Sequence, residues 1–312
     1  MAPRARAPAL RLIDGFDAAG RRIERLRLRA ADRGDAASLH ELRVGLKRMS
    51  AFFLLMGDLG CFSDADGLFR PFRRVFRAAG KVRSLQVAQE RLRAAMIAEG
   101  LELSALFNIL HGEERRVRPA ALRTIREFDA SLWTDRSRRF RGRLSRRGAG
   151  PFRLRCERLA RARLDGLTAG PPPEAMRPAD FHELRIRARF TRETLEILSD
   201  ALPLSAGGRV VGQALRRVYA SLGRWHDGVL MIRRLEGFLE AGGASLEGPG
   251  DYQALIDALE RDCASDLREF EAAWTEFLAL VGKHPRLFAP ARPRRGFIKD
   301  SSGLHPAFTR KR

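Results

Sequence analysis

Two short segments of the sequence place a histidine and several basic residues along one side of an expected helix. In each segment an arginine follows the histidine at the third residue, and further cations follow at intervals of about one helical turn. These residues are His40, Arg43 and Lys47 in the first segment, and His182, Arg185, Arg189 and Arg192 in the second. Imidazole, guanidinium and ammonium groups at this spacing can donate to several oxygens of one phosphate-rich anion. The alternative role for each histidine is a structural hydrogen bond to a neighbouring helix.

The basic residues lie beside the apolar side of their helix rather than opposite it. With His40 at zero on a helical wheel, Arg43 and Lys47 fall at about 300° and 340°. Apolar residues such as Leu42 and Leu46 fall at about 200° to 240°. The second segment has the same arrangement. Cations placed next to a buried face are expected to line a groove or channel between helices.

A second basic stripe is expected further along the chain. It consists of Arg70, Arg74, Arg77 and Lys81, which share one narrow sector of a helix. Like charges at this spacing repel one another, and an anionic ligand would offset the repulsion. The alternative is a solvated basic face that is balanced by glutamates of neighbouring helices. The corresponding positions in the second half of the chain keep two of these cations, Arg217 and Arg224.

The correspondence between the two halves rests on an internal repeat. His40-Glu-Leu-Arg43 returns 142 residues later as His182-Glu-Leu-Arg185. Phe72-Arg-Arg-Val-Phe76 returns as Leu215-Arg-Arg-Val-Tyr219, and Gly80 returns as Gly223. A third match, Glu24-Arg25-Leu26 with Glu157-Arg158-Leu159, differs in offset by one proline-rich loop around residues 170–173. Three matches in the same order indicate an internal duplication.

Long amphipathic segments predict an all-α fold made of two tandem four-helix bundles, related by a pseudo-twofold axis, with a basic channel between them. The expected helices span 10–31, 38–59, 66–98 (with a break near Gly80), 101–131, 152–168, 179–202, 208–241 and 251–281. Ser38 and Asp180 are the expected N-caps of the two motif helices. Gly60, Gly100 and the pair Gly242-Gly243 are the expected helix ends. The expected organisation is a basic N-terminal extension (1–9), a first repeat (10–136), a basic linker (137–151), a second repeat (152–282) and a basic, disordered tail (283–312).

Composition narrows the classes of partner and compartment. The 312 residues contain 59 Lys and Arg against 38 Asp and Glu, a formal net charge of +21. Such a field favours polyanions: nucleic acid, anionic lipid or polyphosphate. Three scattered cysteines without a CxxC spacing, no signal-like N-terminus and no long apolar run predict a soluble, cytoplasmic protein.

The paired segments resemble the signature of the CHAD family, the conserved-histidine α-helical domains, over about residues 10–282. Gly223-Arg-Trp-His-Asp227 is similar to the motif of that family's second half. The resemblance implies two four-helix bundles that enclose a basic channel for inorganic polyphosphate, and some members localise to polyphosphate granules. It implies a structural role for Asp227, which would pair with an arginine of a neighbouring helix. The chain departs from the family pattern at Ser50, Ser84, Ile186 and Glu193, which thins the basic lining.

We therefore expect non-catalytic binding of polyphosphate, with no cofactor and no metal. An enzyme is the first alternative, but no P-loop and no Glu-x-Glu-x-Lys motif is present. Nonspecific RNA binding is the second, although aromatic residues do not alternate with the basic stripes. A scaffolding role on a granule, with polyphosphate as the anchor, is the third.

Overall fold

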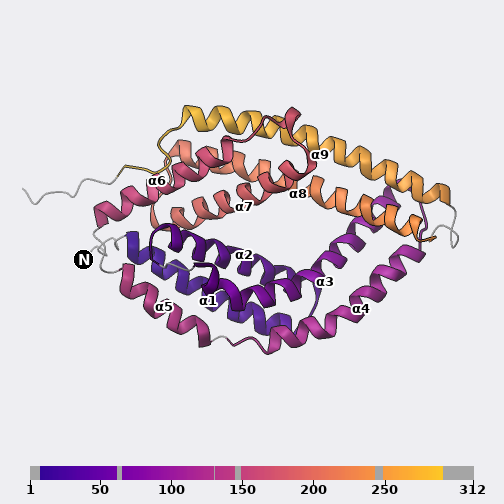
Figure 1. The fold of residues 1–312 in the computed structure, drawn as a ribbon, viewed down its shortest axis with the longest axis horizontal. Coiled ribbons are helices and arrows are strands. Elements are labelled where there is room, and N and C mark those ends of the chain that lie inside the picture. The colour runs from indigo at the N-terminus through magenta and orange to yellow at the C-terminus, as the bar shows by residue number, and fades with distance from the viewer. Residues whose placement is uncertain (1–7, 62–64, 130, 145–148, 243–248, 291–312) are drawn as a thin grey trace, which may run out of the picture.

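The computed structural model describes residues 8–61, 65–129, 131–144, 149–242 and 249–290, and this part of the chain is helical, as the sequence predicts (Figure 1). A 3₁₀ turn, η1, spans Pro173–Ala175. The α-helices of the described residues are α1 Pro8–Arg33, α2 Ala36–Asp58, α3 Ala65–Glu99, α4 Ala105–Arg126, α5 Ser131–Leu144, α6 Ala149–Thr168, α7 Pro178–Ala201, α8 Ala206–Glu240 and α9 Pro249–Lys283.

The structure differs from the expectation at one helix break and in the expected linker. The helix expected to break near Gly80 runs through that residue without interruption in α3. The expected linker, residues 137–151, is largely helical, because α5 extends to Leu144 and α6 begins at Ala149. Phe140 on α5 is fully buried and packs against Phe16 of α1, with ring centroids 4.9 Å apart. An apolar contact of this kind explains why a basic segment folds as a helix here.

The N-caps of the two motif helices lie three residues before the expected positions. Asp35 caps α2 by accepting a hydrogen bond from the Ser38 backbone N–H at 2.7 Å. In α7 the cap residue is Arg177, whose backbone N–H donates to the Asp180 carboxylate at 2.8 Å. Ser38 and Asp180 therefore occupy the third helical position (N3) of α2 and α7, and are not the N-caps.

The expected helix ends are confirmed at three glycines. Gly60, Gly100 and Gly242 all have positive φ, between 65° and 82°, a conformation in which side chains other than glycine are strained. Gly34, with φ of 59°, ends α1 in the same way and was not expected. Gly243 lies outside the described residues.

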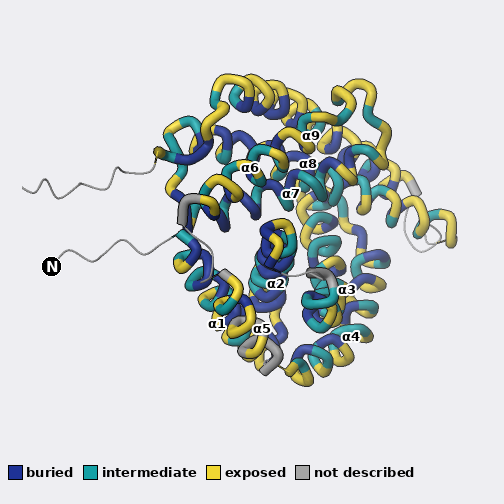
Figure 2. Tube along the Cα trace, turned by 60° about the vertical axis from the view of Figure 1, so that its left-hand side comes forward, coloured by how far each residue is buried: buried dark blue, intermediate teal, exposed yellow. Residues whose placement is uncertain are grey.

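The apolar core continues across both halves of the chain. One large cluster joins buried residues of α1, α2 and α5 with those of α6, α7, α8 and α9. A second, smaller cluster joins the C-terminal part of α3 and the N-terminal part of α4 with α8 and α9. In Figure 1 α2 and α7 lie next to one another in the middle of the molecule, and in Figure 2 the exposed residues follow its outside. The two motif helices therefore meet inside one continuous packed structure.

The first part of the expected tail is packed rather than disordered. Leu287 and Phe288 are buried, and Phe288 forms an isolated antiparallel bridge with Leu204. The Ser205 backbone N–H donates to the Leu287 carbonyl at 2.8 Å. Residues 291–312 of the expected tail and residues 1–7 of the expected extension lie outside the described residues. In the part that is described, no helix has both the length and the apolar character that crossing a membrane requires.

Candidate anion-binding site

Four cations from the two motif helices meet where α2 and α7 face each other. Arg43 and Lys47 project from α2, and Arg185 and Arg189 project from α7; we call these four residues the central basic cluster. All four are half-buried and lie beside fully buried apolar residues such as Leu42 and Leu184. This is the placement that the helical wheel predicts.

The charges of the central basic cluster act on one another at close range. The pKa of Lys47 falls to about 8, first because of burial and then because of the charges of Arg43, Arg189 and Arg185. Burial is also the largest reason why the pKa values of Arg43 and Arg189 are lowered. Among the described residues, no carboxylate lies within ion-pair distance of any of the four side chains. The cluster is a concentration of positive charge without an ion-paired carboxylate among the described residues, and the more distant charges of Asp227 and Glu193 offset it only in part.

Aromatic rings support several guanidinium groups here without neutralising them. Arg43 lies over the Phe76 ring of α3 at 4.9 Å, and Arg189 lies over Phe190 at 4.5 Å. The buried Nε of Arg185 has no hydrogen-bond partner within the described residues. Contact with a ring face positions a guanidinium group but leaves its N–H donors available for an anion.

Arg192 differs from the central cluster although it lies on the same helix. Its Nη2 donates to the buried carboxylate of Glu193 at 2.6 Å, and its guanidinium lies 4.5 Å from the Tyr219 ring centroid. Glu193, one of the departures from the family pattern, thus provides a counter-charge for Arg192. The net charge available to a ligand at this end of the site is reduced.

The two histidines have different surroundings. His182 Nδ1 lies 3.3 Å from Nε2 of His226 on α8, and the rings stack with centroids 5.3 Å apart. His226 Nδ1 in turn lies 3.4 Å from Asp227 Oδ1. His182 therefore makes the interhelical hydrogen bond that was the alternative to anion binding. His40 makes no such bond within the described chain, and its pKa is lowered by partial burial of the ring and by Arg83, Lys47 and Arg43.

Asp227 contributes negative charge at the edge of the site. Burial raises its pKa, but the hydrogen bond from His226 and the charges of Arg91 and Arg185 outweigh this effect, so the pKa stays below its usual value. The expected pairing with an arginine of a neighbouring helix is an electrostatic interaction with Arg91 of α3 and Arg185 of α7. No arginine forms an ion pair within 4 Å of Asp227 in the described structure.

The stripe of α3 does not join the central basic cluster. Its four residues line a separate groove between α3 and α4: Arg70, Arg74, Arg77 and Lys81. The side of α3 that faces α2 instead carries Phe76, Gly80 and Arg83. The α3 stripe was expected to line the same central channel as the motif-helix cations, but in the structure it lines a groove against α4 instead.

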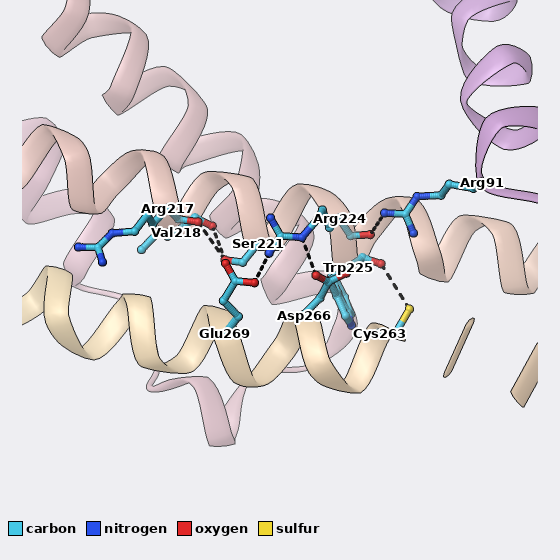
Figure 3. Close-up of polar contacts among 9 residues, drawn as sticks. All are labelled: Arg91, Arg217, Val218, Ser221, Arg224, Trp225, Cys263, Asp266 and Glu269. Carbon is cyan, nitrogen blue, oxygen red and sulfur yellow. Dashed lines mark hydrogen bonds and ion pairs between the residues drawn. The ribbon is translucent and has the colours of Figure 1, made fainter. Parts of the chain in front are cut away.

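Arg217 and Arg224 are placed differently from their repeat partners on α3. Arg224 forms ion pairs with Asp266, at 2.6 Å, and with Glu269 of α9 (Figure 3). Arg217 pairs with Glu276 of the same helix at 2.5 Å. Both arginines thus bridge α8 to α9 and have protein counter-charges. In the structure they are ion-pairing residues of the α8–α9 contact, and their assignment as anion-binding residues stays a prediction.

Three residues near the site were not among the sequence candidates. Arg83 lies close enough to lower the pKa values of His40 and Arg43, and it also pairs with Glu90 at 2.7 Å. Arg91 donates to the Arg224 backbone carbonyl at 2.7 Å (Figure 3). His226 holds His182. The internal repeat could have identified two of these residues, because Arg83 and His226 occupy equivalent positions 143 residues apart.

Comparison with known proteins shows which family this chain belongs to. The model of the CHAD domain matches residues 17–236, which is more than half of the chain and includes both motif helices. The chain belongs to the CHAD family. The matched range is shorter at both ends than the expected 10–282, and it stops before α9.

Solved structures support the CHAD fold of this chain. One is the crystal structure of the CHAD domain from the plant Ricinus communis, with a TM-score of 0.65, 20% identity, and coverage of 86% of this chain and 92% of the other. Another is PptA from Streptomyces chartreusis, with a TM-score of 0.56, 18% identity, and coverage of 89% and 100%. No curated protein matches the chain.

Proposed function

We propose that this CHAD protein binds inorganic polyphosphate at the central basic cluster, without chemical conversion of the polymer. The observation that carries the proposal is the set of four half-buried cations, from α2 and α7, that have no ion-pair partner within the described residues. Partly burying like charges together costs folding free energy, which an anionic ligand would offset. The CHAD family is known for polyphosphate-related proteins, which supports this choice of anion.

The arrangement suits a phosphate polymer better than single-stranded RNA. RNA bound without sequence preference stacks its bases on open aromatic faces. Here guanidinium groups lie over the rings of Phe76, Phe190 and Tyr219. The cluster therefore offers N–H donors for phosphate oxygens, while the rings beside it are already in contact with arginines. Polyphosphate presents closely spaced oxygens and no base, so donors alone can bind it.

The proposed contacts come from part of the sequence candidates. Arg43, Lys47, Arg185 and Arg189 would bind phosphate oxygens directly, and His40 would donate from the edge. His182 would hold α7 against α8 through His226. Bound polyphosphate would also serve as the anchor if the protein localises to polyphosphate granules.

A competition titration tests the proposal. Long-chain polyphosphate and RNA are titrated at equal phosphate concentration and at two salt strengths, and each is also used to displace the other. We expect polyphosphate to bind more tightly at both salt strengths, with affinity falling steeply as salt rises. Tighter binding of RNA at physiological salt would contradict the proposed ligand. Release of orthophosphate in the presence of Mg²⁺ or Mn²⁺ would contradict a purely binding role.

Gly80 provides a test of how Arg43 is positioned. A Cβ at Gly80 would overlap Nη1 of Arg43, so Gly80→Ala should displace the guanidinium from the cluster. We expect polyphosphate affinity to fall several-fold, although alanine favours a helix over glycine by about 1 kcal/mol. Binding is measured by calorimetry and stability by denaturant unfolding.

The repeat supplies a matched control for this variant. Gly223 is the equivalent position on α8, and a Cβ there would have no neighbour within 4 Å. Gly223→Ala should therefore stabilise its helix to a similar extent without loss of polyphosphate affinity. Equal polyphosphate affinities of the two variants would show that binding does not depend on the position of the Arg43 guanidinium beside Gly80.

A further inference from the structure

We propose that the groove between α3 and α4 is a second binding site for phosphate polymers, so that a long polyphosphate chain occupies it together with the central basic cluster. This inference rests on the proposed function. It adds a separate site on the other side of α3, and with it a dependence of affinity on the length of the chain.

The groove is a cavity of about 710 Å³ with a strongly basic lining. Its cations come from both helices and are Arg70, Arg73, Arg74, Arg77, Lys81 and Arg116. No aspartate or glutamate is among the lining residues. A cavity with this lining has a positive potential that attracts anions.

Most of these cations lack a counter-charge in the described structure. Arg74 lies 3.9 Å from Glu127, and both side chains are exposed, so this contact contributes little stability. Arg70, Arg77, Lys81 and Arg116 form no ion pair with any described residue. The glutamates on neighbouring helices that a merely solvated basic face would need are therefore missing at these four positions.

On another basic surface of α4 the arginines have a structural role. Around Arg118, Arg123 and Arg126 a second cavity is also lined by arginines. There, however, Arg118 donates to the Gly34 carbonyl at 2.6 Å and Arg126 to the Ala31 carbonyl at 3.0 Å. These arginines satisfy backbone groups at the C-terminal end of α1, where cations are stabilising. Within the described residues, the side chains of Arg77, Lys81 and Arg116 form no bond of this kind.

The remaining lining indicates which anion fits. Ala78, Val117, Ala120 and Ala121 are small apolar residues, with Thr124 as the other polar one. No aromatic ring is among the described residues that line the groove. Bases of a nucleic acid would have no stacking surface there, whereas a polymer of bare phosphates needs only cations.

The groove and the central basic cluster flank the same stretch of α3. Phe76 lies under the Arg43 guanidinium, and Gly80 leaves space for it. Arg77 and Lys81 of the groove are the next residues in the sequence after these two. An α-helix with its side chains is about 10–12 Å across. A long chain that crosses α3 can therefore bind in both places, while tripolyphosphate is too short to bridge them. Joining two sites through one ligand raises its affinity through the high effective concentration of the second segment.

The test compares the affinities of tripolyphosphate and long-chain polyphosphate in three proteins. These are the wild type, the groove variant Arg74→Gln/Arg77→Gln/Lys81→Gln, and the control Arg21→Gln/Arg22→Gln/Arg25→Gln, which removes three exposed charges from α1. We expect the groove variant to bind tripolyphosphate like the control. Its ratio of long-chain to tripolyphosphate affinity should be at least about tenfold lower than that of the control.

The outcomes separate this inference from the proposed function. An unchanged affinity ratio in the groove variant would overturn the second site, and so would an equally large loss for tripolyphosphate. The proposed function is tested by a different variant, Arg43→Gln/Arg189→Gln, which should lose affinity for polymers of both lengths. If that variant binds both like the wild type, the proposed function fails, whatever the groove variant shows.

Discussion

Replacing both Arg43 and Arg189 with glutamine is expected to weaken the binding of long-chain polyphosphate at least about a hundredfold, since each charge-assisted hydrogen bond contributes about 1.5–3 kcal/mol. One residue lies on α2 and the other on α7, and neither forms an ion pair with a described residue. Their removal therefore leaves no buried carboxylate without a partner. Fluorescence or calorimetric titration measures the affinity.

The fold should survive this double substitution. Both guanidinium groups have pKa values lowered mainly by burial, so the folded protein gains little from their charge. We expect an unchanged helical circular dichroism spectrum and a melting temperature equal to or above that of the wild type. Arg21→Gln/Arg22→Gln, which removes two exposed charges from α1, is the matched control. Wild-type affinity of a well-folded Arg43→Gln/Arg189→Gln protein would show that the central basic cluster is not the binding site.

Replacing Lys47 with methionine is expected to stabilise the ligand-free protein while it weakens polyphosphate binding. The ammonium group is half-buried beside three arginines, and its pKa falls from 10.5 to about 8 in the folded state. A shift of this size, reduced for partial exposure to solvent, corresponds to about 1–3 kcal/mol of destabilisation when the group is charged. Methionine fills a similar volume without a charge.

The pH dependence of unfolding identifies the cause of this stabilisation. Lys47 has a lower pKa folded than unfolded, so its cost is fully present below pH 8 and disappears as the pH rises toward 10.5. The stability difference between Lys47→Met and the wild type should therefore be largest at pH 7 and shrink between pH 8 and 10.5. Denaturant unfolding at each pH measures it. A difference that stays constant with pH would mean that packing, and not charge, distinguishes the two proteins.

The fold could be predicted from the sequence because its helices are long and amphipathic. The expected helices agree with α1 to α4 and α6 to α9 to within about five residues at each end, and three glycines mark helix ends as expected. Helix α5 was missed because arginines dominate residues 137–147, whereas its stability comes in part from one tertiary contact, that of Phe140 with Phe16. Propensity and charge could not reveal that contact.

The candidate site could be predicted only in part, because a basic stripe on one helix does not reveal which residues of other helices lie opposite it. Arg74 and Lys81 on α3 correspond in the repeat to Arg217 and Arg224 on α8. The two sets have different surroundings, because α9 presents Asp266, Glu269 and Glu276 to α8, whereas α4 presents alanines and Arg116 to α3. Equivalent cations therefore form close ion pairs in one half, whereas in the other they line an open groove, where Arg74 makes a long, exposed contact with Glu127 at 3.9 Å. Only the packing of the helices distinguishes these roles.

Site-resolved acylation of lysines tests the central claim most directly. The lowered pKa of Lys47 makes its neutral, reactive amine available near pH 8, and Lys283 at the exposed end of α9 provides an internal reference. The protein is labelled with an amine-reactive ester with and without saturating long-chain polyphosphate, and the rate at each lysine is followed by mass spectrometry. We predict that polyphosphate strongly slows labelling of Lys47 and leaves Lys283 unchanged. An unchanged rate at Lys47, under conditions in which the polymer is bound, would contradict binding at the central basic cluster.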